Sequence, residues 1–240
     1  MNMQFNGPLR IYNGFGITPT TNYEAAGLDF YIPYIKTEEQ ANNFLDAVCK
    51  SYNLKQHEID FLLDLISEEM NTYKLKNDTY TRLNVLHLFL ATKNQYMDHT
   101  KHHEYELRTF FRNGVLVFDD KGIPGVALSL NDTLLINSGI KVGLQPGTAG
   151  IFFNKSGKGN QGFDVRACVV DEDYSGYVHL SMAFTRDKVQ RVYCGDKLTQ
   201  MVILPVCHPT IIEETEETYN QSMQNSYRGD NAFGSSDIKH

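Results

Sequence analysis

Residues 176–206 read GYVHLSMAFTRDKVQRVYCGDKLTQMVILPV, and this stretch carries the strongest indication of the fold class. Short apolar and β-branched runs alternate with turn residues at close intervals, which is typical of strands in an all-β sandwich or barrel rather than of βαβ units. The same texture occurs in DTLLINSGIKVGLQPG at residues 132–147 and in roughly the first 35 residues. We therefore expect a mainly β domain built from residues 1–36 and 114–210.

Between these two parts the pattern becomes helical. Thr37 and Gln40 have the spacing of a capping box, in which each side chain accepts a hydrogen bond from the other residue's backbone. Apolar residues then recur at helical spacing. The stripes are Ala41, Phe44, Leu45 and Val48, then Ile59, Leu62, Leu63, Ile66 and Met70, then Leu83, Leu86 and Leu90 after an Asp78 cap, with a fourth short helix ending before Gly114. Residues 37–113 are predicted to be a helical insertion able to bury a small core of its own.

The last thirty or so residues change character again. The segment IIEETEETYNQSMQNSY is acidic and polar and has few core-forming residues, so residues 211–240 are predicted to form a mobile C-terminal arm. Roughly twenty extended residues reach about 60–70 Å, so the Gly- and Ser-rich end of the arm can cover a site on a neighbouring subunit.

The bulk composition excludes several classes of protein. A formal net charge of -7 argues against direct nucleic-acid binding, which needs clustered Lys and Arg. No apolar run is long enough to cross a bilayer, and MNMQFNGPLR does not have the pattern of a signal peptide. The four cysteines are widely spaced and form no CxxC pair, so neither a disulfide framework nor a zinc knuckle is expected. These features favour a reducing, cytosolic setting without membrane attachment.

Several polar segments could carry chemistry, although each has an ordinary structural explanation. In VVDEDYSG, Asp171 follows a strand at the mouth of a hairpin, where a carboxylate can hold and polarise a water molecule. FFNKSGKGNQG gathers Lys155, Ser156 and Gly157 in one loop, without the spacing of a Walker A motif. In RGDNAFGSSD, Arg228 offers a planar fork of donors for phosphate. Taken singly, the first two segments fit a solvated hairpin and a surface loop equally well, and on composition alone the third is better explained as a disordered terminus.

Two further segments complete the set. GDKLTQ, which ends at Gln200, is a turn that leads into an apolar strand. AAGLDFYIP places Asp29 between apolar residues, where a carboxylate needs either a backbone hydrogen bond or a hydrated cation.

In their order along the chain, AGLDFYIP, NKSG, VVDEDYSG, GDKLTQ and RGDNAFGSSD resemble the five motifs of the homotrimeric dUTPase family. PGTAGIFFNKSG and GFDVRACVVDEDYSG match with few gaps. The resemblance covers residues 20–35 and 120–237, and the helical stretch lies outside it, where the family has a short connection. It implies a jelly-roll-like β fold (β-clip) and a homotrimer whose three active sites are each assembled from three chains.

The resemblance also implies roles for individual residues. Asp171 would orient the water that attacks the α-phosphorus, and Tyr174 would pack under deoxyribose and exclude a 2′-hydroxyl. Asp29 would hold a water of Mg²⁺, the implied cofactor. The other implied substrate contacts are Cys168, Val170 and His179 at the uracil edge, Lys155, Ser156, Gly157, Gln200 and Arg228 at the phosphate side, Phe233 stacked on uracil, and Gly234, Ser235 and Ser236 over the terminal phosphates.

The implied activity is that of a dUTP diphosphatase, which converts dUTP to dUMP and pyrophosphate in the cytoplasm, or in the host cytoplasm for a viral protein. Such an enzyme limits uracil incorporation into DNA and supplies dUMP. One alternative is a dCTP deaminase, but Ser181 stands where that family has its catalytic glutamate. Another is a regulatory or interaction protein that uses the helical insertion as a partner surface.

The sequence departs from the family pattern at a few motif positions. Lys155 replaces a usual Arg and therefore gives a point charge instead of a bidentate fork. Asn154 stands where Pro is common, and Cys168 replaces a common Gly. Asn231 and Ala232 replace two glycines, which narrows the backbone conformations open to the tail. These departures bear on rate and base selectivity, and none removes the implied catalytic acid.

Overall fold

The computed structural model describes residues 8–21, 25–93 and 103–223. The chain divides into one compact unit, Met1–Val206, and a second unit, Cys207–His240. None of the described helices is both long and apolar enough to cross a bilayer.

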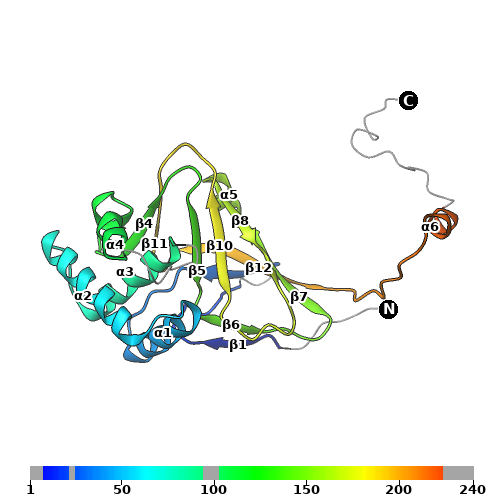
Figure 1. The fold of residues 1–240 in the computed structure, drawn as a ribbon, viewed down its shortest axis with the longest axis horizontal. Helices are drawn as coiled ribbons and strands as arrows, with labels where there is room; N and C mark the ends of the chain where they lie inside the picture. Colours follow the sequence, from blue (N-terminus) through cyan, green and yellow to red (C-terminus); the bar gives the residue numbers. More distant parts are fainter. Residues whose placement is uncertain (1–7, 22–24, 94–102, 224–240) are drawn as a thin grey trace. The chain divides into compact units, whose positions relative to one another are not determined.

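The strands of the first unit form four small antiparallel sheets (Figure 1). Their members, in spatial order, are β1 (Arg10–Asn13) and β6 (Ile140–Gly143); β5 (Thr133–Asn137), β10 (His179–Phe184) and β8 (Phe163–Ala167); β11 (Gln190–Tyr193), β4 (Pro124–Leu128) and β3 (Leu116–Phe118); and β2 (Leu28–Tyr31), β12 (Lys197–Pro205), β7 (Thr148–Asn154) and β9 (Val169–Val170). The predicted β texture on both sides of the helical region is confirmed.

Four helices lie between β2 and β3: α1 (Glu38–Ser51), α2 (Gln56–Thr72), α3 (Thr79–Ala91) and α4 (His103–Arg112). The predicted capping box is present, because Gln40 N donates to Thr37 Oγ1 over 3.2 Å and Thr37 N donates to Gln40 Oε1 over 3.3 Å. Asp78 caps α3 by accepting from two backbone amides. Gly114 follows α4 with a positive φ of 68°, a conformation that favours glycine.

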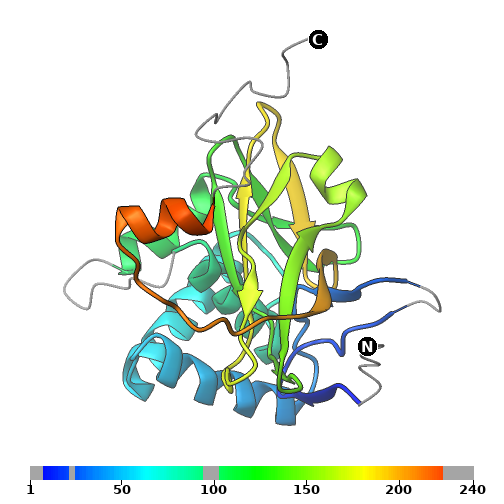
Figure 2. The ribbon, with the colours of Figure 1, turned by 90° about the vertical axis from the view of Figure 1, so that its right-hand side faces the viewer.

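Helix α3 is the centre of the helical region. Every residue from 83 to 91 is buried, although one apolar stripe was predicted, because α3 packs on α2 on one side and on β4 and β5 on another. The helices therefore share one continuous hydrophobic core with the sheets instead of having a separate core. Figures 1 and 2 show the helices on one side of the strands.

Asn84 ties α3 to the segment that follows β2. Its Oδ1 accepts from Ile35 N over 2.9 Å, and its Nδ2 donates to Ile35 O over 2.9 Å and to Tyr80 O over 2.8 Å. Ile35 and Asn84 are both fully buried. The buried backbone is thus satisfied at the point where the chain leaves the sheet for the helices.

The sheet β2-β12-β7-β9 positions most of the predicted site residues. In its register, Gln200 pairs with Asp29 on one side and with Phe153 on the other. Strand β9 pairs with β7 rather than with β10, which itself pairs with β5 and β8. The predicted hairpin is present in part, because β8 and β10 pair antiparallel on either side of residues 168–178, but β9, directly before Asp171, pairs with β7 in another sheet.

The second unit contains one described helix, α6 (Glu216–Ser222), which Thr215 caps by accepting from Thr218 N over 3.3 Å. All residues of this helix are exposed, as the acidic and polar composition leads one to expect. The helix itself was not predicted. The mobility of the arm stays a prediction, and residues 224–240 lie outside the described part of the chain.

Candidate active site

A small cavity of about 180 Å³ opens where β9 and β10 separate into different sheets. Its lining residues are Phe152, Ala167, Val169, Val170, Asp171, Tyr174, Val178 and His179. Four of the predicted site residues, in the third motif and the strand after it, therefore meet around one space. Ligand pockets for whole drug-sized molecules begin at roughly 300 Å³, so this cavity suits a single ring rather than a whole nucleotide. We call it the base pocket.

The turn around the base pocket is held by Tyr174. Its N–H donates to Asp171 O over 3.2 Å, and its hydroxyl donates to Tyr177 O over 2.8 Å. A Cβ at Gly176 would lie 2.6 Å from the Tyr174 hydroxyl oxygen, so a larger residue there would displace the end of the Tyr174 side chain. Burial raises the pKa of Tyr174, which keeps the phenol neutral.

His179 forms another part of the wall. Burial lowers its pKa, which the backbone carbonyl of Tyr177 only partly offsets, so the ring is neutral near pH 7. Its Nδ1 lies 2.9 Å from Tyr177 O, which fixes the proton on Nδ1. Nε2 is then a buried acceptor, and it has no hydrogen-bond partner among the described residues. Cys168, just before β9, is not among the residues that line the base pocket, and its carbonyl accepts from Phe152 N over 2.7 Å.

A second group of predicted residues gathers at the far end of β7. Asp29, with its side chain only 14% exposed, pairs through one oxygen with Lys155 and through the other with Lys197, whose Nζ lies 2.9 Å away. Burial raises the pKa of Asp29, but the hydrogen bonds and charges of the two lysines outweigh it, so the pKa falls below the ordinary 3.8. The hydrogen bond to Asp29 likewise raises the pKa of Lys197. We call these three residues the lysine clamp.

Sequence reasoning missed Lys197, although it belongs to the GDKLTQ segment that was singled out. The lysine and Asp29 are far apart in sequence and meet only because β12 pairs with β2. The available signal was Lys197, a cation inside a polar segment, together with Asp29, a carboxylate placed between apolar residues.

The phosphate segment starts a one-turn helix, α5 (Ser156–Asn160), where a loop was predicted. Ser156 and Gly157 occupy its first turn. Asn154, which replaces the family's proline, accepts from Val165 N over 2.9 Å and donates to Asp164 over 3.2 Å, so it anchors the end of β7 to β8. Its carbonyl accepts from the Gln200 side chain over 3.3 Å.

The base pocket and the lysine clamp are separate within one chain. Phe152 of β7 lines the base pocket, whereas Lys155 follows the end of the same strand, roughly 10 Å further at the usual rise per strand residue. The predicted tail contacts Arg228, Phe233, Gly234, Ser235 and Ser236, and the substitutions Asn231 and Ala232, lie outside the described residues.

Comparison with known proteins identifies the family. The dUTPase family matches residues 122–237, which include the base pocket, Lys155, Lys197 and Gln200. This part of the chain belongs to the dUTPase family. The fold is accordingly a dUTPase-like β fold with an α-helical region before it, mixed α/β overall.

Individual relatives are distant. The Gag-Pro polyprotein of Mason-Pfizer monkey virus is 33% identical over 103 residues, which are 43% of this chain and 10% of the polyprotein. The chain thus spans about a tenth of the length of such retroviral relatives. The deoxyuridine 5'-triphosphate nucleotidohydrolase of Histophilus somni (strain 2336) is 28% identical over 144 residues, covering 57% of this chain and 90% of that enzyme. A solved mutant of the phage 80alpha dUTPase is 12% identical, with 96% and 99% of the two chains covered and a TM-score of 0.48.

dUTPases typically use Mg²⁺, and the residues present fit a weakly held hydrated ion. Among the described residues, no group of three or more His, Cys, Asp or Glu side chains forms a metal site. Asp29 and Gln200 are paired across β2 and β12, so both side chains lie on one face of the sheet. Both Asp29 oxygens are already paired with lysines, so a Mg²⁺ ion would bind mainly through its waters and the substrate phosphates.

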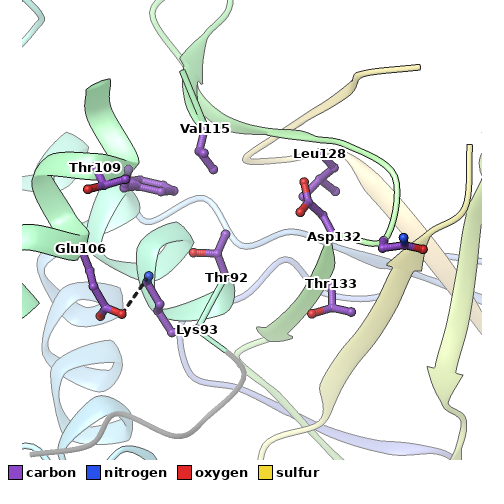
Figure 3. A pocket seen from close by; sticks show the side chains of 10 residues that line it. Thr92, Lys93, Glu106, Thr109, Val115, Leu128, Asp132 and Thr133 are labelled. Carbon is purple, nitrogen blue, oxygen red and sulfur yellow. Dashed lines mark ion pairs between the residues drawn. The ribbon is translucent and has the colours of Figure 1, made fainter. Parts of the chain in front are cut away.

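A larger cavity, of about 290 Å³, lies away from these residues between the end of α3, α4 and the β4–β5 turn (Figure 3). Its charged groups are already engaged. Lys93 pairs with Glu106 over 3.4 Å, and Asp132 accepts from Ser129 N over 2.6 Å. This cavity contains none of the predicted site residues and offers little free polar chemistry.

Proposed function

We propose that this chain is a dUTP diphosphatase that hydrolyses dUTP to dUMP and pyrophosphate. The observation that carries the proposal is the base pocket, where Asp171, Tyr174 and His179 surround a space of about 180 Å³. Membership of residues 122–237 in the dUTPase family supports it. The curated deoxyuridine 5'-triphosphate nucleotidohydrolase of Histophilus somni is a relative that carries this activity in its name.

In the proposed complex, uracil enters the base pocket against Phe152 and Val178. The backbone around Cys168 and Val170 pairs with the polar edge of the base. The ring of Tyr174 packs under deoxyribose, so a 2′-hydroxyl has no room. A space this small selects a pyrimidine over a purine.

Asp171 acts as the general base in this proposal. Its carboxylate holds a water molecule and takes one proton as the water oxygen bonds to the α-phosphorus. The bond from that phosphorus to the bridging oxygen breaks, and pyrophosphate leaves. The balance is one water consumed, with dUMP and pyrophosphate formed.

In the proposed complex, the lysine clamp binds the phosphates of dUTP. Lys155 and Lys197 are held in place by Asp29 and present their remaining donors. The first N–H groups of α5, at Ser156 and Gly157, have no intrahelical partner and add to the anion-binding surface. A bound Mg²⁺ would offset the charge that develops on the phosphates. From the tail, Arg228 would bind phosphate, Phe233 would stack on uracil, and Gly234, Ser235 and Ser236 would cover the terminal phosphates.

The separation of the base pocket from the lysine clamp favours a homotrimer with sites shared between chains. The outer face of the β12-β7-β9 sheet also carries exposed apolar side chains. Val169 is 59% exposed, Phe153 44% and Leu204 40%. Surfaces of this kind mark contacts with another protein, here another copy of the chain.

The proposal is tested by steady-state hydrolysis of dUTP, dCTP, dTTP and UTP with Mg²⁺. We expect dUMP and pyrophosphate from dUTP, with little product from the other three nucleotides. Removal of Mg²⁺ with EDTA should lower the rate strongly. No product from dUTP, equal turnover of UTP, or ammonia release from dCTP would reject the assignment.

A further inference from the structure

A further cavity, of about 420 Å³, lies where α1 meets the β1–β6 pair and the turn before β10. The dUTP chemistry proposed above does not use it. Tyr174 and His179 line both this cavity and the base pocket, so they form a shared wall. Because α1 supplies much of the opposite wall, we call this space the helix-side cavity.

Two tyrosines line the helix-side cavity with aromatic rings that are tilted against each other. The rings of Tyr12 and Tyr177 lie 6.4 Å apart between centroids, with a tilt of 37°. Tyr12 is 51% exposed, so a ligand can reach its ring from solvent. A base stacked on an aromatic side chain gains roughly 1–3 kcal/mol whatever its identity.

Cations lie beside this aromatic surface. Lys141 Nζ is 5.0 Å from the Tyr177 centroid and 5.8 Å from the Tyr12 centroid, and Lys50 of α1 also lines the cavity. Neither lysine forms an ion pair with a residue that the structure describes, and Asp46 is the acid that shares the lining. The shared wall also holds the buried acceptor Nε2 of His179, which has no hydrogen-bond partner among the described residues. Aromatic rings beside two ammonium groups that form no ion pair with a described residue match a base that carries phosphate.

We propose that the helix-side cavity binds a free purine nucleoside phosphate, with the base on Tyr12 and the phosphates at Lys50 and Lys141. Its volume is more than twice that of the base pocket, about 420 Å³ against about 180 Å³, which favours the two-ring base. The net charge of -7 disfavours a nucleic-acid chain as the source of the nucleotide. A ligand here presses on Tyr174 and His179 and so changes the KM for dUTP, a consequence that rests on the proposed function.

Isothermal titration of the intact chain with ATP and with GTP tests the binding. We expect a Kd of about 1 mM or tighter for at least one of them. Lys50→Glu and Lys141→Glu should each weaken this binding by about tenfold or more, because each replaces a phosphate contact with a repulsion. Lys121→Glu is the matched control, since Lys121 is exposed in the β3–β4 turn, and it should change the Kd by less than about twofold.

The dUTP hydrolysis assay is run on the same preparations, with and without the purine nucleotide. Nucleotide binding that is lost in both cavity variants supports the proposed binding site, whether or not the chain hydrolyses dUTP. If the chain binds the purine nucleotide but does not hydrolyse dUTP, only the proposed function fails. Hydrolysis of dUTP without detectable binding of ATP or GTP at about 10 mM overturns the cavity alone. Equal weakening in Lys121→Glu also overturns it.

Discussion

The two aspartates of the candidate site have different surroundings. Asp29 is neutralised by Lys155 and Lys197, which lower its pKa below the ordinary value. Asp171 forms no ion pair with any residue that the structure describes and lines the base pocket. A carboxylate clamped by two ammonium groups is a poor proton acceptor, whereas an unpaired one can hold and deprotonate water. This contrast favours Asp171 as the base and Asp29 as a positioning residue.

The lysine clamp leads to a prediction for Lys197. Lys197→Gln should raise the KM for dUTP by about tenfold, with a smaller change in kcat, because one phosphate contact is lost in both substrate and transition state. Lys197→Arg keeps the charge and should restore most of the affinity. Steady-state kinetics measure both parameters, and an unchanged KM in Lys197→Gln would remove Lys197 from the phosphate site.

The buried His87 leads us to predict that the free energy of unfolding depends on pH. It is fully buried against Phe15 and Phe44, and burial lowers its pKa to about 4, with the neighbouring His179 also opposing its charge. The unfolded chain takes up this proton below the ordinary 6.5, so the stabilisation is complete above that pH and is lost as pH falls toward 4. The loss is at most about 3 kcal/mol. His179, whose pKa is also lowered, acts in the same direction.

Urea unfolding at pH 7 and pH 5 measures this effect. His87→Phe should flatten the fall in unfolding free energy between the two values, because the aromatic packing remains and the titrating group is gone. His57→Gln, at an exposed position of α2, is the control and should follow the wild-type curve. A His87→Phe curve as steep as the wild type would contradict the assignment.

At the scale of elements, α2 and α4 are joined by one arginine. Arg108 of α4 pairs with Glu104 on its own helix and with Glu68 and Glu69 of α2. Glu69 is only 4% exposed, so its charge depends on this partner. Arg108→Leu should therefore lower the unfolding free energy, because it leaves the buried Glu69 carboxylate without its partner.

The matched variants make this prediction specific. Glu68→Ala removes only an exposed partner and should change stability by less than about 1 kcal/mol. The double variant Glu69→Leu with Arg108→Leu leaves no buried charge unpaired and should recover most of the loss. Equal destabilisation by Glu68→Ala and Arg108→Leu in denaturant titration would show that burial of Glu69 does not matter.

Local sequence patterns predicted where helices begin and end better than they predicted which elements pack against one another. The Thr37 capping box and the stop before Gly114 depend on adjacent residues, and both are confirmed. The burial of all sides of α3 was not predictable, because its second face is covered by β4 and β5, which come later in the chain. The pairing of β9 with β7 is likewise a long-range choice that no local pattern encodes.

The same distinction applies to the site. The ordered motifs predicted Asp171, Tyr174 and His179, which meet in the base pocket. They did not predict the contact between Lys197 and Asp29, which depends on the register of β12 against β2. Nor could they predict the helix-side cavity, whose walls come from parts of the chain that only the tertiary fold brings together.

At the scale of the whole molecule, the proposed trimer predicts complementation between inactive chains. Asp171→Asn disables the base and should be nearly inactive, whereas Lys155→Ala weakens the clamp and should turn over little dUTP at concentrations well below its raised KM. If one chain supplies the base pocket and another the clamp, randomly mixed trimers should contain about a quarter of intact sites. Co-expression followed by a dUTP hydrolysis assay tests this, and a mixture no more active than its parents would place both groups of one site in the same chain.

The central claim is that Asp171 supplies the base for dUTP hydrolysis in the pocket between β9 and β10. The most direct measurement compares wild type with Asp171→Asn in two assays, binding of α,β-imido-dUTP and turnover of dUTP with Mg²⁺. We predict that the wild type releases dUMP and pyrophosphate, while the variant binds the analogue within about threefold and loses at least about a hundredfold in kcat. An inactive wild type, or a variant that keeps its turnover, would contradict the claim.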